Sequence, residues 1–263
     1  MPLEWDAAEY EAVSAPQTGW GGHFLQILLE RRALKGNEAA VDVGCGTGRV
    51  TELLLRHLPR GTVLAVDASE AMAEAARRRF AGDPRVRVER RDILRLEVDE
   101  SVDVIFSTAT FHWIMNHERL FDHLARLLKP GGRLVAQCGG RGNIARTLAV
   151  AERVMDEERF RDAFAGWEAG WNFAHPETTK ARLEAAGFEE IEAWLHEEFT
   201  EFASVGELTR FLKTVVLKPH LTFLPEAERD PFATAVATRL AEKGSLVVDY
   251  VRLNMLATRS GTA

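Results

Sequence analysis

The chain has 263 residues, of which 46% are hydrophobic and 28% are charged, and these proportions are typical of a compact folded protein. Its formal net charge of −7 argues against a protein that holds a nucleic acid backbone, because that task needs a basic face. No apolar run is long enough for a membrane span, and acids stand where a signal peptide would carry basic residues, so we expect a cytoplasmic enzyme with neither a nucleic acid nor a membrane as partner.

Short apolar runs alternate with longer helical patterns in the first half of the chain. The apolar runs predict strands at 39–44, 62–69, 85–92, 102–110 and 133–138. The helical patterns predict helices at 49–58, 69–81 and 117–128, and KPGG at 129–132 predicts a turn. Because such alternation favours parallel strands joined by right-handed crossovers, we expect an α/β fold with a doubly wound sheet that helices cover on both faces.

The pattern changes after the fifth predicted strand. Residues 141–177 read as mostly helical, aromatic and without a strand, which indicates an insertion. A helix that Gly187 ends, a strand at 191–202, helices near 204–217 and 225–242, and a last strand near 245–259 follow. We expect one domain over 1–263, made of a helical cap (1–35), a core (36–140), a helical lid (141–177) and C-terminal strands (178–263) with a helical insertion at 204–242.

The first predicted strand ends in a turn that carries Gly44, Gly46 and Gly48. A glycine-rich turn between a strand and a helix presents backbone N–H groups and the positive end of the helix dipole to a ligand. A dinucleotide site would need a further glycine at position 49, where Arg49 stands. Asp42, two residues before the first glycine, suits an ammonium group instead, so we expect a ligand that carries an amine.

Five motifs occur in a fixed order over residues 41–137: VDVGCGTGR, VLAVDAS, RRDILRL, VDVIFSTATFHWI and LLKPGGRLVAQ. In these motifs the chain resembles the class I S-adenosylmethionine-dependent methyltransferases. The resemblance implies a Rossmann-like, mostly parallel seven-stranded sheet with an antiparallel last strand. It also implies S-adenosyl-L-methionine as cofactor and a small molecule as methyl acceptor, in a monomer or a homodimer.

The resemblance also assigns cofactor contacts. The glycine turn would lie under the methionine part, the acid after the second strand would hold the ribose hydroxyls, the residues after the third strand would meet the adenine, and the end of the fourth strand would lie beside the sulfonium. The residues concerned are Asp42, Gly44, Cys45, Gly46, Gly48, Asp67, Ala68, Met72, Asp92, Ile93 and Ser107. Read singly, Asp67 could instead belong to a helix cap and Asp92 to a turn.

The aromatic N-terminal segment resembles the cap of small-molecule methyltransferases similar to the trans-aconitate and juvenile hormone acid methyltransferases. That resemblance makes Gln17 and Trp20 cofactor contacts and Tyr10 a substrate contact. The alternative is a helix that covers the sheet and holds the chain end.

The acceptor would be an oxygen nucleophile, and a carboxylate needs no general base whereas a hydroxyl does. His112 is the candidate base because its loop follows the fourth strand, although His112 and Trp113 could simply pack the mouth of the pocket. Trp171 and Trp113 are expected on the substrate side, and Arg141 or Arg146 would suit an anionic acceptor unless they are solvated loop residues. Cys45 and Cys138 lack metal-site spacing, so we expect free thiols and no metal.

Two other functions remain open from the sequence. The chain could bind the cofactor or a protein partner without catalysis, in which case no small acceptor would be methylated. A nicotinamide-dependent dehydrogenase is a third possibility, which Arg49 and the missing later glycine argue against.

Overall fold

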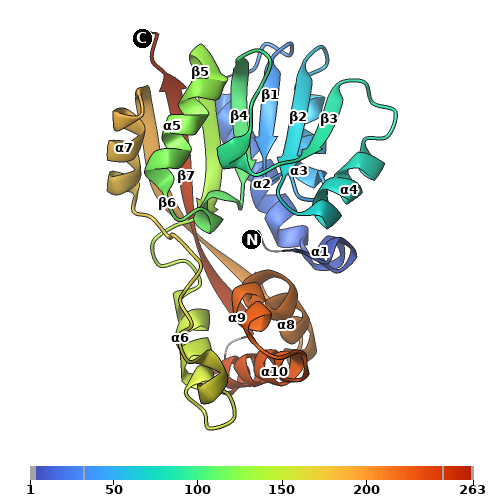
Figure 1. Cartoon of the computed structure of the whole chain (residues 1–263), viewed down its shortest axis with the longest axis vertical. Helices are drawn as coiled ribbons and strands as arrows, with labels where there is room; N and C mark the ends of the chain where they lie inside the picture. Colours follow the sequence, from blue (N-terminus) through green and yellow to red (C-terminus); the bar gives the residue numbers. More distant parts are fainter. Residues whose placement is uncertain (1–3, 32, 245, 262–263) are drawn as a thin grey trace.

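The computed structural model describes residues 4–31, 33–244 and 246–261. These residues form a seven-stranded sheet in the order β3-β2-β1-β4-β5-β7-β6 (Figure 1). The strands are β1 (Ala39–Val43), β2 (Thr62–Asp67), β3 (Val86–Arg90), β4 (Val102–Thr108), β5 (Leu128–Gly139), β6 (Phe188–Glu201) and β7 (Val247–Arg259). Strands β1 to β5 are parallel, and β7 runs antiparallel to both β5 and β6. The expected sheet with an antiparallel last strand is therefore confirmed.

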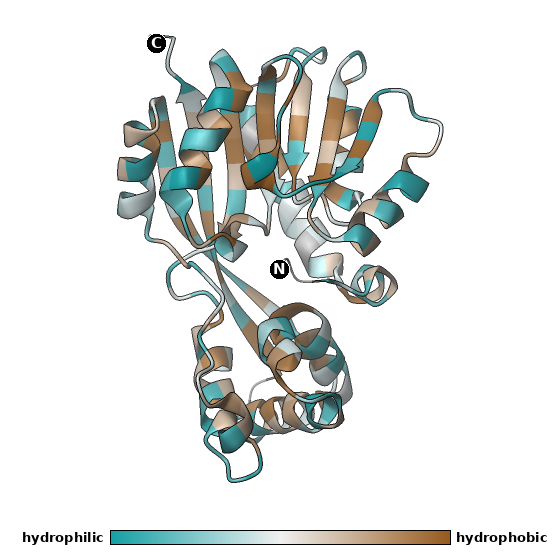
Figure 2. Ribbon diagram, viewed as in Figure 1, coloured by the Kyte–Doolittle hydropathy of each residue, from teal (hydrophilic) through white to brown (hydrophobic). Residues whose placement is uncertain are grey.

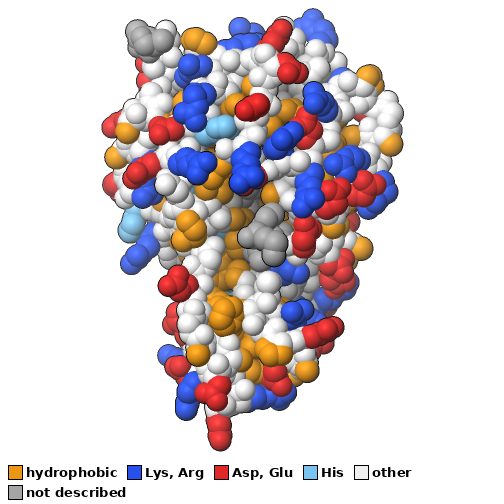
Figure 3. Space-filling model, viewed as in Figure 1, with side chains coloured by type: hydrophobic (Ala, Val, Ile, Leu, Met, Phe, Trp, Pro, Cys, Tyr) orange, Lys and Arg blue, Asp and Glu red, His pale blue; other side chains and the backbone are white. Residues whose placement is uncertain are grey.

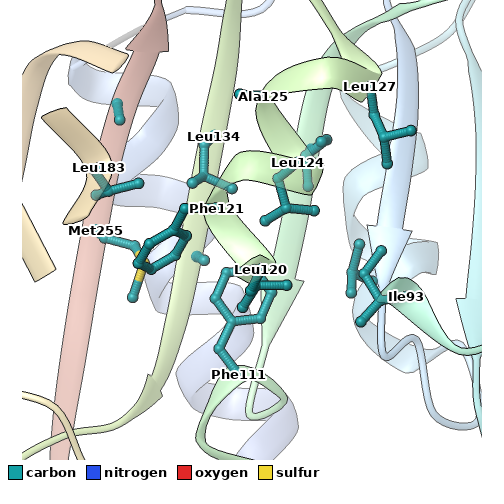
Figure 4. Close-up of a cluster of buried hydrophobic side chains, with 14 of the residues drawn as sticks. Ile93, Phe111, Leu120, Phe121, Leu124, Ala125, Leu127, Leu134, Leu183 and Met255 are labelled. Atoms are coloured by element: carbon teal, nitrogen blue, oxygen red, sulfur yellow. The ribbon is translucent and has the colours of Figure 1, made fainter. Parts of the chain in front are cut away.

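Helices cover both faces of the sheet, as its apolar strands require. One face carries α2 (Ala15–Arg31), α3 (Arg49–Arg56) and α4 (Glu70–Arg79), and the other carries α5 (His117–Leu127) and α7 (Pro176–Ala185). Figure 4 shows Leu120, Phe121 and Leu124 of α5 against Leu134 of β5, with Leu183 of α7 beside them. Figure 2 shows the central strands as predominantly hydrophobic, which is the pattern of strands buried on both sides.

The turn expected at 129–132 lies within a strand. Leu128 pairs with Val102 and Arg133 pairs with Val104, so four residues of β5 bulge out opposite one residue of β4. Gly131 has a φ of +75°, which lets the chain leave the ladder and return to it. The local sequence predicted the bend correctly, but the strand resumes the same pairing after it instead of beginning there.

The helices outside the sheet form a separate layer below its carboxyl edge, which we call the helical lobe (Figure 1). It comprises α6 (Ala145–Met155), a 3-10 turn (Arg161–Phe164), α8 (Val205–Phe211), a π-helical turn (Leu212–Val216), α9 (Lys218–Phe223) and α10 (Glu226–Glu242). The first helix expected in the insertion, near 204–217, is thus divided into α8 and the π-helical turn, and α9 follows where no helix was expected. Residues 165–175 of the expected lid are not helical, and a single parallel bridge joins Ala174 to Gly140.

Strands β6 and β7 extend from the sheet into the helical lobe (Figure 1). Val248 and Tyr250 of β7 belong to the lobe's hydrophobic core, together with Phe160, Phe211 and Phe232. One strand therefore packs in the sheet at one end and in the lobe at the other. None of the helices in the described residues is long and apolar enough to cross a membrane.

Candidate active site

A cleft of about 1360 Å³ lies between the carboxyl ends of the parallel strands, the N-terminal helix α1 (Ala7–Val13) and the helical lobe. Ligands of open parallel sheets bind at this edge. Figure 3 shows hydrophobic side chains gathered in the hollow between the sheet and the lobe. The volume exceeds what a single drug-sized ligand fills, so the cleft has room for a cofactor and an acceptor together.

The glycine turn after β1 forms one wall of the cleft through Gly44 and Gly46. A Cβ at Gly44 would stand 1.9 Å from Thr110 Oγ1, so the loop after β4 closes on this bare backbone. A Cβ at Gly46 would meet nothing within 4 Å, so open space lies over that residue. Cys45 is buried against Ala65 and does not line the cleft, and Gly48 is the N-cap of α3.

Asp67 lies at the end of β2 and lines the same wall. Its Oδ2 accepts a hydrogen bond from Gly46 N–H at 2.9 Å, and its Oδ1 accepts one from Ser69 N–H at 2.9 Å. Burial raises the pKa of this carboxyl above its usual value. Because each carboxylate oxygen offers two acceptor positions, two positions remain for a vicinal diol in the cleft.

Asp42 and Ser107, like Cys45 and Gly48, do not line the cleft as expected. Asp42 is buried and accepts a hydrogen bond from Thr51 Oγ1 at 2.5 Å, and burial raises its pKa to about 7. Ser107 is fully buried and donates to the carbonyl of Val43 at 2.8 Å. Both side chains tie β1 to its neighbours, so the geometry gives no support to a direct contact of either with the ligand.

The residues expected near the adenine do line the cleft. Ala68 and Met72 approach from the end of β2 and from α4, and Asp92 and Ile93 approach from the turn after β3. Asp92 Oδ1 accepts a hydrogen bond from Leu94 N–H at 2.9 Å, which fixes that short 3-10 turn. Met72 and Ile93 are buried, and they offer the apolar surfaces between which a flat ring can lie.

The N-terminal segment covers the cleft with Trp5, Tyr10 and Trp20. Glu11 of α1 accepts hydrogen bonds from Arg49 Nε at 2.9 Å and from Arg79 Nη2 at 2.5 Å, and it also pairs with Thr47. These bonds tie α1 to α3, α4 and the glycine turn. The side chain of Gln17 lies outside the described residues, so its predicted contact stays a prediction.

His112 follows β4 and lines the cleft with 8% of its surface exposed. Its Nδ1 accepts a hydrogen bond from the backbone N–H of Gly139 at 3.2 Å. Burial lowers the pKa of the ring well below its ordinary value, so the imidazole is neutral and, by this hydrogen bond, carries its proton on Nε2. His112 therefore offers the cleft a donor, and the expected role as general base has no support in this geometry.

Arg252 of β7 is the main residue of the cleft that the sequence analysis missed. It is 3% exposed, and its guanidinium lies 5.0 Å from the ring centre of Trp20 and 5.8 Å from that of Tyr250. It makes no hydrogen bond or ion pair with any described residue, and Nε is buried without a partner. The sequence signal was an arginine within a mostly apolar predicted strand.

Arg141 and Arg146, the cations expected to bind an anion, are exposed and lie outside the cleft lining. Arg141 follows β5, where its backbone N–H donates to the carbonyl of Ala174 at 3.0 Å, and Arg146 lies on α6. The geometry therefore gives no support to a contact of either with an acceptor, and Arg252 is the buried arginine among the described residues that line the cleft.

Aromatic side chains complete the cleft beside His112. Trp113 lies 4.9 Å and Phe173 lies 5.9 Å from the His112 ring centre, and Trp171 stacks on Phe173 at 5.9 Å. The backbone N–H of Asn172 donates to the carbonyl of His112 at 2.9 Å, which attaches the irregular segment 165–175 to the loop after β4. Trp113 and Trp171 thus line the cleft as expected.

The sheet order and the glycine turn at its carboxyl edge define a Rossmann-like α/β protein, a class whose ligands bind at that edge. A family model described as "Methyltransferase domain" matches residues 41–136. The trans-aconitate 2-methyltransferase of Methylobacterium nodulans is 33% identical over 98% of this chain and 99% of its own, and that of Rhizobium meliloti is 28% identical over 98% and 100%. The chain belongs to this family of S-adenosylmethionine-dependent methyltransferases, which confirms the predicted enzyme class and cofactor.

Solved structures support the fold. The YcgJ protein of Bacillus subtilis is similar with a TM-score of 0.62 and 15% identity, over 90% of this chain and 98% of that one. A phosphoethanolamine N-methyltransferase of Haemonchus contortus, solved with S-adenosyl-L-methionine, has a TM-score of 0.57 and 19% identity. The match covers 90% of this chain and 52% of that one. At these identities the likeness concerns the fold alone.

The residues present fit the cofactor. Gly46 leaves open backbone where a bulky group can approach, and Asp67 keeps acceptor positions for a ribose diol. When bound, S-adenosylmethionine supplies a methyl group activated by a sulfonium. The chain itself must hold the nucleoside, orient the acceptor and exclude water.

Proposed function

We propose that this enzyme methylates a carboxylate oxygen of a small organic acid. The observation that carries the proposal is Arg252, a buried guanidinium that lines the cleft, lies over two aromatic rings and makes no hydrogen bond or ion pair with any described residue. A buried cation without a counter-ion is costly, and an acidic ligand removes that cost. The curated relatives are named for an organic acid, trans-aconitate, which agrees with this choice.

We assign the cofactor to the side of the cleft formed by β1, β2 and β3. Gly44 and Gly46 would lie under the methionine part and Asp67 would hold the ribose diol. Asp92, Ile93 and Met72 would enclose the adenine, and Tyr10 and Trp20 would cover the cofactor from above. In the sheet, β7 lies three places from β1, about 14 Å at the usual strand spacing, and the Arg252 guanidinium lies against Trp20, so we place Arg252 where the acceptor would meet the cofactor.

The state of His112 favours a carboxylate over a hydroxyl. A carboxylate is ionised at neutral pH and only has to be aligned, whereas a hydroxyl needs a group that accepts its proton. The Nδ1 lone pair of His112 accepts the hydrogen bond from Gly139 N–H, so the ring presents Nε2–H to the cleft. That donor can hold one carboxylate oxygen while the other faces the methyl group, and alignment alone gives a large share of the rate.

Arg252→Gln tests the proposal. We expect the KM for an acidic acceptor to rise by about 10- to 100-fold, because a hydrogen bond to a charged group contributes about 1.5–3 kcal/mol. The dissociation constant for S-adenosylhomocysteine should stay within about twofold of that of the unaltered enzyme, a margin of about 0.4 kcal/mol.

Arg141→Gln is the matched control, because Arg141 is exposed and lies outside the cleft lining. It should leave both constants unchanged. Methylation of alcohols, phenols or amines without methylation of any acid would refute the proposal, and so would an Arg252→Gln enzyme with an unchanged KM.

A further inference from the structure

We propose that the acceptor is a monocarboxylic acid with a flat, unsaturated or aromatic body, bound with its carboxylate on Arg252 and its body against the aromatic wall of the cleft. By aromatic wall we mean Trp113, Trp167, Trp171 and Phe173, all four of which line the cleft. This inference rests on the proposed function and narrows it, since the curated relatives are named for an acid with three carboxylates.

Polar donors converge at one point of the cleft, Gly139. This residue pairs with Arg252 across β5 and β7, and directly opposed residues of an antiparallel pair project to the same face. A Cβ on Gly139 would stand 2.7 Å from Asn143 Nδ2 and 2.7 Å from a ring carbon of Phe173. The backbone N–H of Gly139 donates a hydrogen bond to His112 Nδ1. Arg252, Asn143 and His112 thus surround the same glycine.

All three side chains offer N–H groups there. Asn143 Oδ1 accepts the backbone N–H of Val251 at 3.0 Å, which leaves its Nδ2 as a donor with no hydrogen-bond partner in the described residues. His112 presents Nε2–H, and the two aromatic rings beside Arg252 contact it without satisfying its N–H groups. A cluster made only of donors recognises an anion, and its size suits one carboxylate.

A second carboxylate would find no cation nearby. The other basic residues of the described cleft lining are Arg90, Arg91 and Arg95. They are exposed and lie at the end of β3 or shortly after it, and β3 lies five places from β7 in the sheet, about 24 Å at the usual strand spacing. Arg90 and Arg91 also pair with acids of their own side of the molecule, Glu70 and Glu89. Burying an unpaired carboxylate beside the aromatic wall would be costly.

The surface next to the donors is apolar and continuous. Trp113, Trp171 and Phe173 are half-buried, so each keeps ring surface toward the cleft. Met115 and Phe223, 59% and 46% exposed, extend this surface to the mouth. Stacking against such rings favours a planar or unsaturated body over a compact polar one. Anion recognition at one end and apolar contact along the rest define an amphipathic acid.

The experiment compares acids that differ in charge and in apolar surface. Cinnamic acid and indole-3-acetic acid serve as flat monoacids, octanoic acid as a flexible one, and trans-aconitic acid as the triacid. S-adenosylhomocysteine release is measured at saturating cofactor, and each product is identified as a methyl ester. We expect kcat/KM for a flat monoacid to exceed that for the triacid by about tenfold or more, which corresponds to about 1.4 kcal/mol.

Trp171→Leu provides the second readout. Loss of the stacking surface should lower kcat/KM for the flat monoacid about fivefold to tenfold, mainly through KM, and should leave the affinity for S-adenosylhomocysteine unchanged. Phe199→Leu is the matched control, because Phe199 lies exposed on the edge strand β6 and outside the cleft lining. Trp113→Leu repeats the test if the first variant unfolds.

The outcomes separate this inference from the proposed function. A higher kcat/KM for the triacid overturns the inference and leaves carboxylate methylation intact. An enzyme that methylates no acid but does methylate an alcohol or amine overturns both. If Trp171→Leu lowered kcat/KM equally for flat and flexible acids, the aromatic wall would not distinguish the shape of the acceptor. That result would also overturn the inference.

Discussion

At the scale of single residues, hydrogen-bond acceptors lie at one end of the cleft, where we place the nucleoside, and hydrogen-bond donors lie at the other end, where we place the proposed acid. Asp67 lies on the cofactor side with two backbone N–H bonds already made. On the other side lie N–H groups that have no hydrogen-bond partner among the described residues, from Arg252, Asn143 and His112. The charge distribution of the cleft therefore matches a neutral sugar at one end and an anion at the other.

Asp67→Asn should weaken the binding of S-adenosylhomocysteine by about 1.5–3 kcal/mol, because the amide accepts one charge-assisted hydrogen bond fewer and exposes an NH2 group to the diol. Titration calorimetry measures the change. Asp122→Asn is the control, since Asp122 is exposed on α5 and away from the cleft. Equal affinities for the two variants would exclude Asp67 as the ribose ligand.

The sequence predicted the glycine turn and Asp67 at one wall of the cleft because the signals for them are local. The order of Asp42, Gly44, Gly46 and Asp67 along the chain reflects one strand, one turn and the next strand. Even there, the pattern could not tell that Asp42 faces Thr51 inside the fold rather than the ligand. Facing direction depends on the packing of α3 against β1, which residue types do not specify.

The acceptor side could not be located in the same way. Arg252 approaches His112 only because β7 pairs antiparallel with β5, which sets Arg252 opposite Gly139. That pairing joins residues far apart in the sequence. Arg141 was the more obvious choice because it follows a strand directly, but its side chain is exposed.

At the scale of elements, α1 closes the cleft over the cofactor side, and its attachment is mostly polar. Glu11 is the residue that connects it to Arg49, Arg79 and Thr47, and no residue of α1 is buried. Glu9 adds an ion pair with Arg210 of α8, and Val13 packs against the hydrophobic core of the lobe. A short helix held mainly by such surface contacts can detach without unfolding the sheet. We therefore expect α1 to open when the cofactor exchanges.

Glu11→Gln should therefore raise the dissociation constant of S-adenosylhomocysteine and speed proteolytic cleavage before residue 35, while the melting temperature changes little. Glu74→Gln is the control, because Glu74 pairs only with exposed arginines of its own helix, α4. Cleavage that is no faster than in the control would show that α1 does not depend on this carboxylate.

At the scale of the whole molecule, the helical lobe has a core of its own that contains a buried histidine. His220 of α9 is surrounded by Trp167 at 4.5 Å, Phe232 at 5.7 Å and Phe164 at 6.1 Å, and its Nδ1 has no partner. Burial lowers its pKa to about 4. In the unfolded chain this histidine has an ordinary pKa near 6.5, so between about pH 6.5 and pH 4 it is protonated in the unfolded chain and neutral in the folded one.

The lobe should consequently lose stability as the pH falls from about 6.5 toward 4. At pH 5 the loss from His220 amounts to about 2 kcal/mol. His220→Gln should lower the melting temperature at pH 7.5 but show a smaller further decrease between pH 7.5 and pH 5 than the unaltered protein does. An identical decrease in both proteins, measured by calorimetry, would mean that His220 does not cause the acid sensitivity.

The unpaired guanidinium of Arg252 has a last consequence under the proposed reaction. An acid arrives with a negative charge and leaves as an ester with none. The attraction that captures the acid thus vanishes at the moment of transfer, and the neutral product is left beside a cation that it cannot neutralise. The loss of the ligand's negative charge would thus weaken its binding and promote release of the ester, without any further conformational step.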